Sequence, residues 1–581
     1  MCGIVGYIGN RRAAQIIILG LKRLEYRGYD SFGVATLNGG ISLSKKSGRI
    51  SDTDSGIAGL PGSIGIGHTR WATHGVPNDQ NAHPHIDCTG RIAVVHNGII
   101  DNYAELKQDL IARGHVFSSD TDTEVIAHLV EECYSGDIRS AVAEILPIIE
   151  GSYAILVIAE GDDRIIAARM SSPLVIGVGD REFFCASDVT PLIEHTRRVI
   201  YIEDGDCVEL SKDSFQVTHH GFPVERAIEY VDWDVQEARK GGFPHYMLKE
   251  IFEQPQVFYN TLQAVIEASG SLGVLSKRTM MISIVACGSS FHAGLLYKYI
   301  IETYCNIPVR VELGSEFKYY TPPLTDPVIG LTQSGETADT LAALKMAKAC
   351  GCPTLAITNV VGSSVSRIAD ATIYTRAGPE MSVAATKSFM AQVAAGLQIA
   401  AFLSDPSLEK EFERANVLME EALMVPVEEA VALCTGAQSV FFIGRGFYFP
   451  VALEGALKMK EVSYIHAEGY AAGELKHGPF ALLSPKTPVV VIAMPGWTYP
   501  VMISNIKEIK TRGAPVIGIG STGDQELPEL VDIFLPLPAS HDLIGIATVS
   551  VLLQRLAYMT ADALRCDIDK PRNLAKSVTV E

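Results

Sequence analysis

Roughly the first 215 residues alternate short apolar runs with polar turns, and few stretches keep the spacing of a long helix. Runs rich in Val and Ile predict strands, and apolar positions three or four residues apart predict helices. The expected strands are 3–8, 91–95, 154–159, 164–168, 174–177 and 207–210, and the expected helices are 13–24, 103–113 and 123–132. Many short strands with few helices predict an α+β layered domain.

Beyond about residue 270 the pattern changes to a buried strand, a glycine turn and a helix, repeated several times. An apolar run at 282–286 leads into Cys-Gly-Ser-Ser at 287–290, and another at 328–331 leads into Thr-Gln-Ser-Gly-Glu-Thr at 332–337. Short buried strands that alternate with helices predict a parallel sheet with helices on both faces.

This α/β pattern occurs twice. Cys287 and Gly444 end corresponding strands, and Gly-Cys-Pro-Thr-Leu at 351–355 matches Gly-Ala-Pro-Val-Ile at 513–517 at nearly the same separation. The offsets favour a duplicated domain, although chance similarity between two α/β units produces the same signs. We expect a layered domain at 2–217, a polar linker at 218–269, α/β domains at 270–410 and 430–571, and a tail at 572–581.

Composition narrows the class of protein. The 581 residues carry 48 Lys and Arg against 67 Asp and Glu, a net charge of −19, which argues against a surface built for nucleic acid or anionic membrane. No apolar run reaches the ~18 residues of a membrane span; the closest, 389–403, is interrupted by Gln392 and Gln398 and is expected to be a buried helix. The first residues lack a signal-peptide pattern. Eleven scattered cysteines without a Cys-x-x-Cys pair suit a reducing compartment. We therefore expect a cytoplasmic, multidomain enzyme.

Cys2 is the first candidate for chemistry. Removal of a Met that precedes a small residue leaves Cys2 with both a thiol and a free α-amine. Because an α-amine titrates near about pH 8, part of it is a neutral base at pH 7 that can activate an adjacent nucleophile. The alternative is an ordinary cysteine at a frayed terminus.

Polar residues in three later segments favour the catalytic alternative. Acyl transfer from glutamine needs a cation for its carboxylate, an anion for its ammonium group and donors for the tetrahedral oxyanion. Arg70 offers the cation and Asp122 the anion. The side-chain amide of Asn97 and the backbone N–H of Gly98 offer two donors.

These residues belong to segments that resemble the class II, or N-terminal nucleophile, glutamine amidotransferases. The resemblance lies in Cys-Gly-Ile-Val-Gly at 2–6, Leu-Glu-Tyr-Arg-Gly-Tyr-Asp at 24–30, and the segments 69–75, 96–100 and 119–124. It implies an αββα hydrolase fold with catalytic residues Cys2, Asn97 and Gly98. The implied glutamine-binding residues are Arg70, Trp71, Thr73, His74 and Asp122.

A crowd of histidines raises the alternative of a metal site in the same region. The candidates are His68, His74, His83, His85, His96 and Cys88. They lack the paired spacing of a structural zinc site and the His-Glu-x-x-His helix of a catalytic one. We expect no metal, and we expect these histidines to serve loops and packing.

The two hydroxyl-rich turns at 287–290 and 332–337 follow strands where helices begin. Backbone N–H groups and the helix dipole make such turns anion sites, and hydroxyls add donors. In open α/β sheets ligands bind at this edge. The corresponding strand of the second repeat ends in Met-Pro-Gly-Trp at 494–497, which lacks these donors. The pattern favours one phosphosugar site, in the first repeat, over two capped helix starts.

The turns resemble the sugar isomerase (SIS) domain, and the whole chain resembles the isomerising glutamine–fructose-6-phosphate aminotransferases through residues 453–463, 466–479 and 569–581. This resemblance implies transfer of ammonia from glutamine to fructose 6-phosphate, giving glucosamine 6-phosphate and glutamate, the first step of amino-sugar synthesis. The implied phosphosugar-binding residues are Gly288, Ser289, Ser290, Thr332, Gln333, Ser334, Thr337, Val383, Lys458 and Ala575.

The resemblance also assigns the sugar chemistry, which needs ring opening, imine formation and proton transfer from C1 to C2. Lys576 matches the Schiff-base lysine, Glu461 the proton shuttle, and His477 an acid–base group from a neighbouring subunit. Glu454, Lys458 and Glu461 share one face of a predicted helix, and their spacing also suits a solvated, ion-paired surface.

The same resemblance implies no cofactor, a homodimer or larger homo-oligomer that shares His477, and a water-poor passage for ammonia gated by Trp71. Two positions depart from the family pattern: Thr332 stands where Ser is usual, and Ala385 lacks one possible contact. The long insertion typical of eukaryotic members is absent from the first domain and linker, which weakens the expectation of feedback control. Another amidotransferase would need a phosphoribosyl or ATP motif, which is not found. A phosphosugar isomerase, deaminase or sensor with an idle first domain is the remaining alternative.

Overall fold

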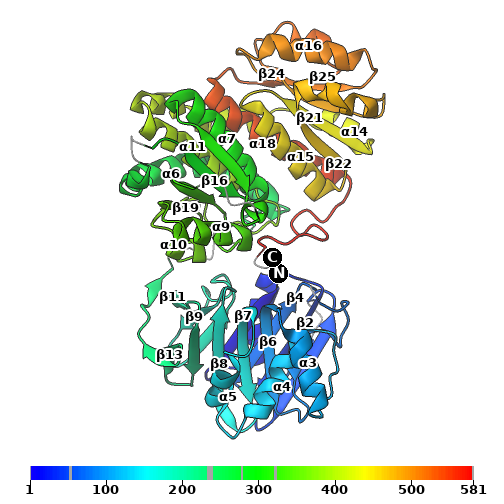
Figure 1. The fold of residues 1–581 in the computed structure, drawn as a ribbon. Helices are drawn as coiled ribbons and strands as arrows, with labels where there is room; N and C mark the ends of the chain where they lie inside the picture. Colours follow the sequence, from blue (N-terminus) through cyan, green and yellow to red (C-terminus); the bar gives the residue numbers. More distant parts are fainter. Residues whose placement is uncertain are drawn as a thin grey trace. The chain divides into compact units, whose positions relative to one another are not determined.

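The computed structural model describes residues 2–25, 27–50, 55–72, 74–231, 240–275, 279–319 and 324–578. The chain folds into two compact units (Figure 1). Unit 1 comprises residues 1–235 with 577–581, and unit 2 comprises residues 236–576.

Unit 1 is built on two antiparallel sheets. The strands of the first are β1 (Gly3–Ile8), β2 (Ser31–Leu37), β3 (Ile41–Ser47), β4 (Ile64–Arg70), β9 (Val175–Val178), β10 (Phe183–Ala186), β11 (Arg198–Tyr201) and β15 (Glu229–Tyr230). Those of the second are β5 (His85–Ile86), β6 (Ile92–Ile100), β7 (Gly151–Ala159), β8 (Asp162–Met170), β12 (Asp206–Leu210), β13 (Phe215–His219) and β14 (Phe222–Val224). The orders are β15-β11-β9-β10-β1-β4-β2-β3 and β14-β13-β12-β8-β7-β6-β5.

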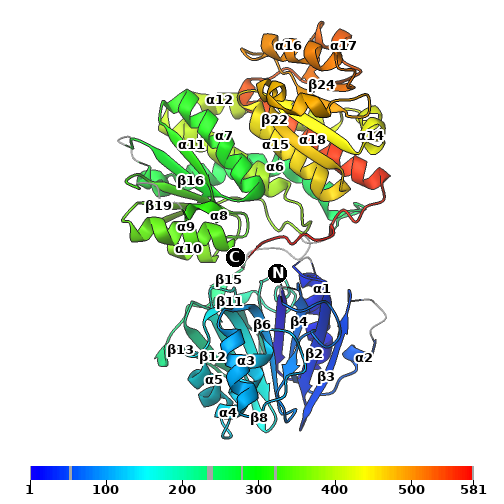
Figure 2. The ribbon, with the colours of Figure 1, turned by 45° about the vertical axis from the view of Figure 1, so that its right-hand side comes forward.

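The sheets of unit 1 stack face to face with helices outside them (Figures 1 and 2). Ile4 and Ile66 of the first sheet share one apolar core with Leu156 and Val208 of the second. Helix α1 (Ala13–Leu24) covers the first sheet, where Ile17 packs against β4. The remaining helices are α2 (Ser55–Ala58), α3 (Tyr103–Ala112), α4 (Glu124–Cys133) and α5 (Ile138–Ile145), and the last three share a core with the second sheet. The predicted αββα layering is confirmed.

Unit 2 contains two parallel sheets of five strands. The first consists of β16 (Ile282–Ala286), β17 (Val309–Leu313), β18 (Val328–Leu331), β19 (Thr354–Thr358) and β20 (Ala371–Tyr374), and the second of β21 (Ser439–Gly444), β22 (His466–Ala471), β23 (Val489–Ile492), β24 (Val516–Ser521) and β25 (Ile533–Leu537). Their orders, β17-β16-β18-β19-β20 and β22-β21-β23-β24-β25, are the same when each set is counted along the chain. The repeated sequence pattern therefore corresponds to two α/β domains of one topology.

Helices cover both sheets of unit 2. They are α6 (Tyr246–Glu267), α7 (Gly288–Cys305), α8 (Gly314–Phe317), α9 (Ala338–Ala349), α10 (Ser364–Ile368), α11 (Lys387–Leu403), α12 (Glu409–Phe412), α13 (Ala415–Leu423), α14 (Glu428–Thr435), α15 (Tyr448–Ser463), α16 (Tyr499–Lys510), α17 (Leu527–Leu530) and α18 (Asp542–Ala563). Short 3₁₀ segments lie at η1 (Ser269–Val274), η2 (Pro406–Leu408), η3 (Ala472–His477) and η4 (Pro479–Leu482). One apolar core runs through both halves, because α7, α11, α15 and α18 all contribute to it.

Helix α18 is the described segment that most resembles a membrane span. By length and composition it could cross a membrane, with a hydropathy of 1.5, but 89% of that window is buried inside the fold. The prediction that 389–403 comes closest is wrong, because those residues lie in α11, which is a shorter apolar helix than α18. Helix α18 serves here as a core element packed on α15 and α13.

The segment 218–269, expected as a polar linker, is largely structured. Its first part completes β13 and supplies β14 and β15, and its last part forms α6. Both short strands are edge strands with mostly exposed side chains, so their sequence carries little apolar signal. This exposure explains why they looked like connecting chain.

Candidate active sites

Cys2 lies at the start of β1, between the ends of strands from both sheets of unit 1. The register of β1 on β4 places Gly3 opposite Thr69, so Trp71 follows beside Cys2. The Trp71 N–H donates to the Cys2 Sγ at 3.3 Å. From β6, the Asn97 amide donates to the Cys2 carbonyl oxygen at 3.1 Å. Two strands therefore bring backbone and side-chain donors to the thiol residue.

The surroundings of Cys2 keep its thiol protonated. Burial raises the pKa of Cys2 above its ordinary value, while the N-terminal charge, the Trp71 N–H and Arg70 act in the opposite direction. Because the thiolate is the reactive form, such a thiol needs a nearby base before it can attack. The free α-amine expected on Cys2 after removal of Met1 would meet that need.

Arg70 and Asp122 place opposite charges around Cys2. Arg70 ends β4 with only 3% of its surface exposed, and its guanidinium donates to the backbone oxygens of His74 and Gly75. Its Nη1 has no hydrogen-bond partner among the residues that the structure describes. Asp122 accepts from the Ile100 N–H at 2.9 Å and is also buried. A buried cation with a spare donor and a buried anion complement the two charged groups of a free amino acid.

The predicted oxyanion donors sit on β6. Asn97 Oδ1 lies 3.0 Å from His68 Nε2, which leaves its amide NH₂ directed at Cys2. Burial, followed by the charge of Arg70, lowers the pKa of His68 to about 3, so the ring is neutral. Gly98 has a φ of +134°, and a Cβ there would lie 1.9 Å from the Ser152 oxygen. The backbone at 98 therefore accepts only glycine, which explains the Asn-Gly pair.

The predicted glutamine loop follows β4. Trp71 packs edge-on against Tyr29 with ring centroids 5.8 Å apart, and the Ala72 N–H donates to Asp30 at 2.9 Å. His74 contacts the Tyr103 ring at 5.2 Å. Thr73 lies outside the described residues.

The histidines considered as metal ligands bond protein groups instead. His83 packs against His68 with the rings tilted and ring centroids 4.1 Å apart, and against His85 edge to face with ring centroids 4.7 Å apart. Burial lowers the pKa of all three rings. His85 contacts Thr121 Oγ1 at 3.0 Å, and His96 contacts Thr123 Oγ1 at 2.9 Å. These bonds fix the segment that carries Asp122.

In unit 2, the turn at 287–290 connects β16 to α7. Ser289 Oγ donates to Glu454 Oε1 at 2.9 Å and accepts from Lys458 Nζ at 3.1 Å. Ser290 Oγ accepts from Gln392 at 3.0 Å. Gly288 has a φ of +57°, which eases the sharp reversal into the helix. The turn of the first repeat is thus tied to α15 of the second repeat.

The second hydroxyl-rich turn, 332–337, follows β18, the neighbour of β16. Thr332 Oγ1 lies 2.8 Å from Thr337 Oγ1 and accepts from the Gly335 N–H at 3.2 Å. The Gln333 carbonyl accepts from the Asn359 N–H at 3.0 Å. Because both strands end at one edge of a parallel sheet, the two turns lie together, as predicted.

Lys458 is the centre of a charged group on α15. Its Nζ lies 2.5 Å from Glu461 Oε2 and 3.4 Å from Glu454 Oε1. Although burial lowers the pKa of Lys458, the charges of Glu461 and Glu454 raise it above its ordinary value. The alternative of a solvated helix face is wrong, because Lys458 is 0% exposed and Glu454 only 2%.

The C-terminal tail returns to the first repeat. Asp569 accepts from the backbone N–H groups of Tyr246 and Met247 at the start of α6, both at 3.0 Å. Lys576 then forms an ion pair with the fully buried carboxylate of Glu380. Burial raises the pKa of Glu380, but the charge of Lys576 and the hydrogen bonds from Lys576 and Ser388 together lower it to about 2.

Sequence reasoning missed Glu380 and its neighbour Glu250. Glu250 Oε1 accepts from the backbone N–H groups of Met381 and Ser382, at 2.5 and 3.1 Å. Burial, together with the charge of Glu380, raises the pKa of Glu250 to about 8. No sequence spacing signals that these carboxylates meet the tail.

Val383 and His477 make fewer contacts with the other predicted site residues. Val383 donates its N–H to the Asp569 oxygen at 3.0 Å, which ties it to the tail that carries Ala575. His477 ends η3 with an exposed ring, and it makes no hydrogen bond or ion pair with any described residue. Within one chain, the structure does not bring His477 to Glu461 or Lys576.

Comparisons with known proteins agree with this architecture. The SIS domain family matches residues 275–401 and 434–563, and the glutamine amidotransferase domain family matches residues 68–194. Relatives named glutamine–fructose-6-phosphate aminotransferase (isomerizing) from Chlorobaculum tepidum and Methanothermobacter thermautotrophicus are 46% and 47% identical, each with all of both chains covered.

Solved structures are similar over unit 2. The C-terminal domain of glucosamine-fructose-6-phosphate aminotransferase from Francisella tularensis is 36% identical, with a TM-score of 0.53 over 57% of this chain and 99% of that chain. A putative phosphosugar isomerase from Silicibacter pomeroyi is 27% identical, with a TM-score of 0.51 over 56% of this chain and 100% of that chain.

Proposed function

The chain belongs to the family of isomerising glutamine–fructose-6-phosphate aminotransferases, and on this basis we propose that it transfers ammonia from glutamine to fructose 6-phosphate, giving glucosamine 6-phosphate and glutamate. One observation carries the proposal: a single chain holds both a thiol near Arg70 and Asp122 and, in its C-terminal tail, a lysine paired with the buried carboxylate of Glu380. A protein that only hydrolyses glutamine would need the first set of groups alone, and a protein that only acts on a sugar phosphate would need the second set alone. Together they suit a reaction that takes nitrogen from one substrate and gives it to a second.

The first half-reaction uses unit 1. The Cys2 thiol gives its proton to the free α-amine and attacks the amide carbon of glutamine. Asn97 and the N–H of Gly98 stabilise the resulting oxyanion, ammonia leaves, and water releases glutamate from the thioester. Arg70 binds the α-carboxylate and Asp122 the α-ammonium group, while Trp71, Thr73 and His74 close over the substrate.

The second half-reaction uses unit 2. The turns carrying Gly288, Ser289 and Ser290, and Thr332, Gln333, Ser334 and Thr337, bind the phosphate and sugar hydroxyls, with Val383, Lys458 and Ala575 completing the pocket. His477 of a neighbouring subunit opens the ring. Lys576 forms an imine with C2 and is displaced by ammonia, and Glu461 then moves a proton from C1 to C2.

The Lys576–Glu380 pair requires one further step. An ammonium group cannot attack a carbonyl, so the proton of Lys576 must leave before the imine forms. Glu380 contacts that ammonium directly and is the acceptor at hand. Because its pKa is about 2 while paired, the transfer needs substrate binding to disturb the pair.

The organisation of the chain follows from this function. We place the glutaminase domain at 2–217, the connecting segment at 218–269, SIS domains at 270–410 and 430–571, and the catalytic tail at 572–581. The protein acts in the cytoplasm as a homodimer or larger homo-oligomer that exchanges His477, and it needs no cofactor. Ammonia passes from one site to the other without release to water.

A coupled assay tests the proposed function. Glutamine and fructose 6-phosphate should yield glucosamine 6-phosphate and glutamate in a ratio of about one, and omission of glutamine should stop synthesis. An SIS-type isomerase or deaminase would instead convert the sugar phosphate without glutamine. Sugar conversion at the same rate in the absence of glutamine would overturn the proposal.

A further inference from the structure

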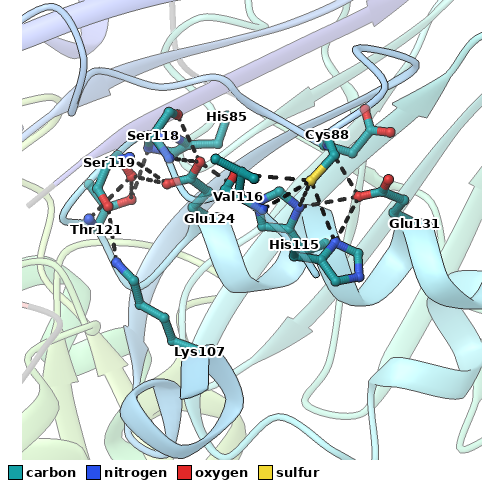
Figure 3. A network of polar contacts seen from close by, with 12 residues as sticks. His85, Cys88, Lys107, His115, Val116, Ser118, Ser119, Thr121, Glu124 and Glu131 are labelled. Carbon is teal, nitrogen blue, oxygen red and sulfur yellow. Dashed lines mark hydrogen bonds and ion pairs between the residues drawn. The ribbon is translucent and has the colours of Figure 1, made fainter. Parts of the chain in front are cut away.

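Four potential metal ligands meet on the helical side of the second sheet of unit 1. Cys88 lies in the turn between β5 and β6, His115 follows α3, and His128 and Glu131 lie one turn apart on α4. The ligand atoms, Cys88 Sγ, one ring nitrogen from each histidine and a Glu131 oxygen, all lie within 4.8 Å of one another. Figure 3 shows Cys88, His115 and Glu131 directed at a common point.

Four of the six distances between these atoms are close to the edges of a zinc tetrahedron. Bonds of about 2.3 Å to sulfur and about 2.0–2.1 Å to nitrogen or oxygen give S···N edges of about 3.6 Å and N···O edges of about 3.3 Å. Cys88 Sγ lies 3.6 Å from His115 Nδ1 and 3.5 Å from His128 Nδ1. Glu131 Oε2 lies 3.1 and 3.2 Å from the same two nitrogens.

The outer contacts have the pattern that orients metal-bound histidines. A ligating ring usually directs its second nitrogen at a carboxylate or carbonyl oxygen. His115 directs Nε2 at Glu132 Oε1 at 3.4 Å, whereas His128 Nε2 lies 3.7 Å from Glu124 Oε1, which is beyond hydrogen-bond length. In both rings Nδ1 therefore faces the common point, while Nε2 faces a carboxylate.

The four residues differ in exposure, so one side of the group is buried and the other side faces solvent. The side chain of His128 is 1% exposed, that of His115 11% and that of Glu131 18%, whereas Cys88 is exposed. The backbone N–H of Val116 donates to Cys88 Sγ at 3.4 Å, and the N–H of Cys88 donates to Glu131 Oε2 at 3.1 Å. The ligands are thus held in place, and an ion can reach them from solvent.

We propose that Cys88, His115, His128 and Glu131 bind one zinc ion in a closed, four-ligand structural site. This site is separate from both proposed reaction centres and does not depend on the proposed function. It was not foreseen, because only Cys88 falls within the histidine-rich stretch, and the other ligands are dispersed between 115 and 131. Binding joins the thiolate to the metal and releases the thiol proton to solvent.

The proposed ion would brace the segment that carries Asp122. Glu124, which faces His128, also accepts from the backbone N–H groups of Ser118 and Ser119, at 2.7 and 2.6 Å (Figure 3). Zinc on His128 would hold α4 against the β5–β6 turn and so fix the start of the helix just beyond Asp122. A structural metal of this kind adds to the stability of unit 1 by mass action.

Metal content of the full-length protein tests the site. The chain is stripped with a chelator, incubated with equimolar zinc, desalted and analysed for zinc by mass spectrometry. Wild type and the control Cys350→Ser, which removes an exposed thiol of unit 2, should each retain about one zinc per chain. Cys88→Ser and His115→Gln should retain at least about tenfold less.

Thiol labelling of the unmodified chain gives a second measurement that no misfolded variant can confuse. Zinc should slow alkylation of Cys88 at least about tenfold while leaving exposed Cys350 unchanged, and a chelator should restore the rate. The proposal fails if wild type retains no zinc, if Cys88→Ser and His115→Gln retain as much as wild type, or if zinc leaves Cys88 labelling unchanged. The cluster would then be a metal-free set of hydrogen bonds.

Discussion

Lys576 and Glu380 form a buried ion pair although 196 positions separate them in the sequence. The pair fastens the C-terminal tail to the first α/β repeat. While this ion pair is intact, the Lys576 nitrogen is engaged with Glu380 and is not available to a substrate. The resting structure therefore stores the proposed nucleophile in a protected form.

Replacing the lysine tests its role in the imine step. Lys576→Ala should lower glucosamine 6-phosphate synthesis by at least about a thousandfold, because no Schiff base can form, and should leave glutamate release from glutamine within about threefold. In wild type, borohydride with fructose 6-phosphate should add a sugar-phosphate mass to a peptide containing Lys576. A stable adduct on a different lysine would contradict the assignment.

The carboxylate pair near the tail predicts a pH-dependent stability. The pKa of Glu250 is raised to about 8 in the folded chain, so the folded state binds more protons than the unfolded state between about pH 4.5 and 8. Stability from this group is fully present below about pH 4.5 and is lost as the pH rises towards 8. Glu250→Gln, which mimics the protonated form, should reduce this loss.

The comparison uses thermal unfolding of wild type and Glu250→Gln at pH 5.5 and 8. One pKa unit corresponds to about 1.4 kcal/mol. The free energy of unfolding of the variant minus that of wild type should therefore be about 1–3 kcal/mol larger at pH 8 than at pH 5.5. Glu253→Gln, an exchange at a partly exposed carboxylate of the same helix, is the matched control. An equal pH dependence in wild type and Glu250→Gln would show that Glu250 is ionised in both states.

Asn97 offers a direct test of the oxyanion site. Its amide already donates to Cys2, and Asn97→Ala removes one of two proposed donors to the tetrahedral intermediate. The kcat for glutamine hydrolysis should fall about 10²–10³-fold with little change in KM. Borohydride trapping of fructose 6-phosphate on Lys576 should be unaffected, which separates the loss of a donor from general damage to the fold. A raised KM at unchanged kcat would assign Asn97 to substrate binding instead.

Trp71 tests whether the two reactions are coupled. If the indole gates the passage of ammonia, Trp71→Ala should still release glutamate, but the yield of glucosamine 6-phosphate per glutamate should fall well below one. If the indole only packs against Tyr29 and shapes the glutamine loop, both products should fall together. Both products measured in one reaction distinguish the two roles.

Regular elements with strong apolar patterns were predictable from the sequence. The bounds of β1, α1, β16 and β18 agree with the apolar runs, since buried strands and amphipathic helices leave a direct signal. Short edge strands such as β14 and β15 leave almost none, because few of their side chains are buried.

Candidate sites were predictable only where chemistry and resemblance pointed to particular residues. The sequence brought Cys2, Arg70, Asn97 and Asp122 into one group, and their roles stay predictions. It could not place Glu380 opposite Lys576, because long-range pairing has no periodic signal. The group around His128 was missed for the same reason: its ligands come from three separate elements.

Isotope transfer tests the central claim most directly. Wild-type protein is given glutamine labelled with ¹⁵N at the amide, fructose 6-phosphate and an excess of unlabelled ammonium salt, and the glucosamine 6-phosphate is analysed by mass spectrometry. The account predicts that nearly all of the product carries ¹⁵N, because nitrogen passes from the glutamine site to the sugar site without mixing with solvent. Product that carries mainly unlabelled nitrogen, or glutamate without any amino sugar, would contradict it.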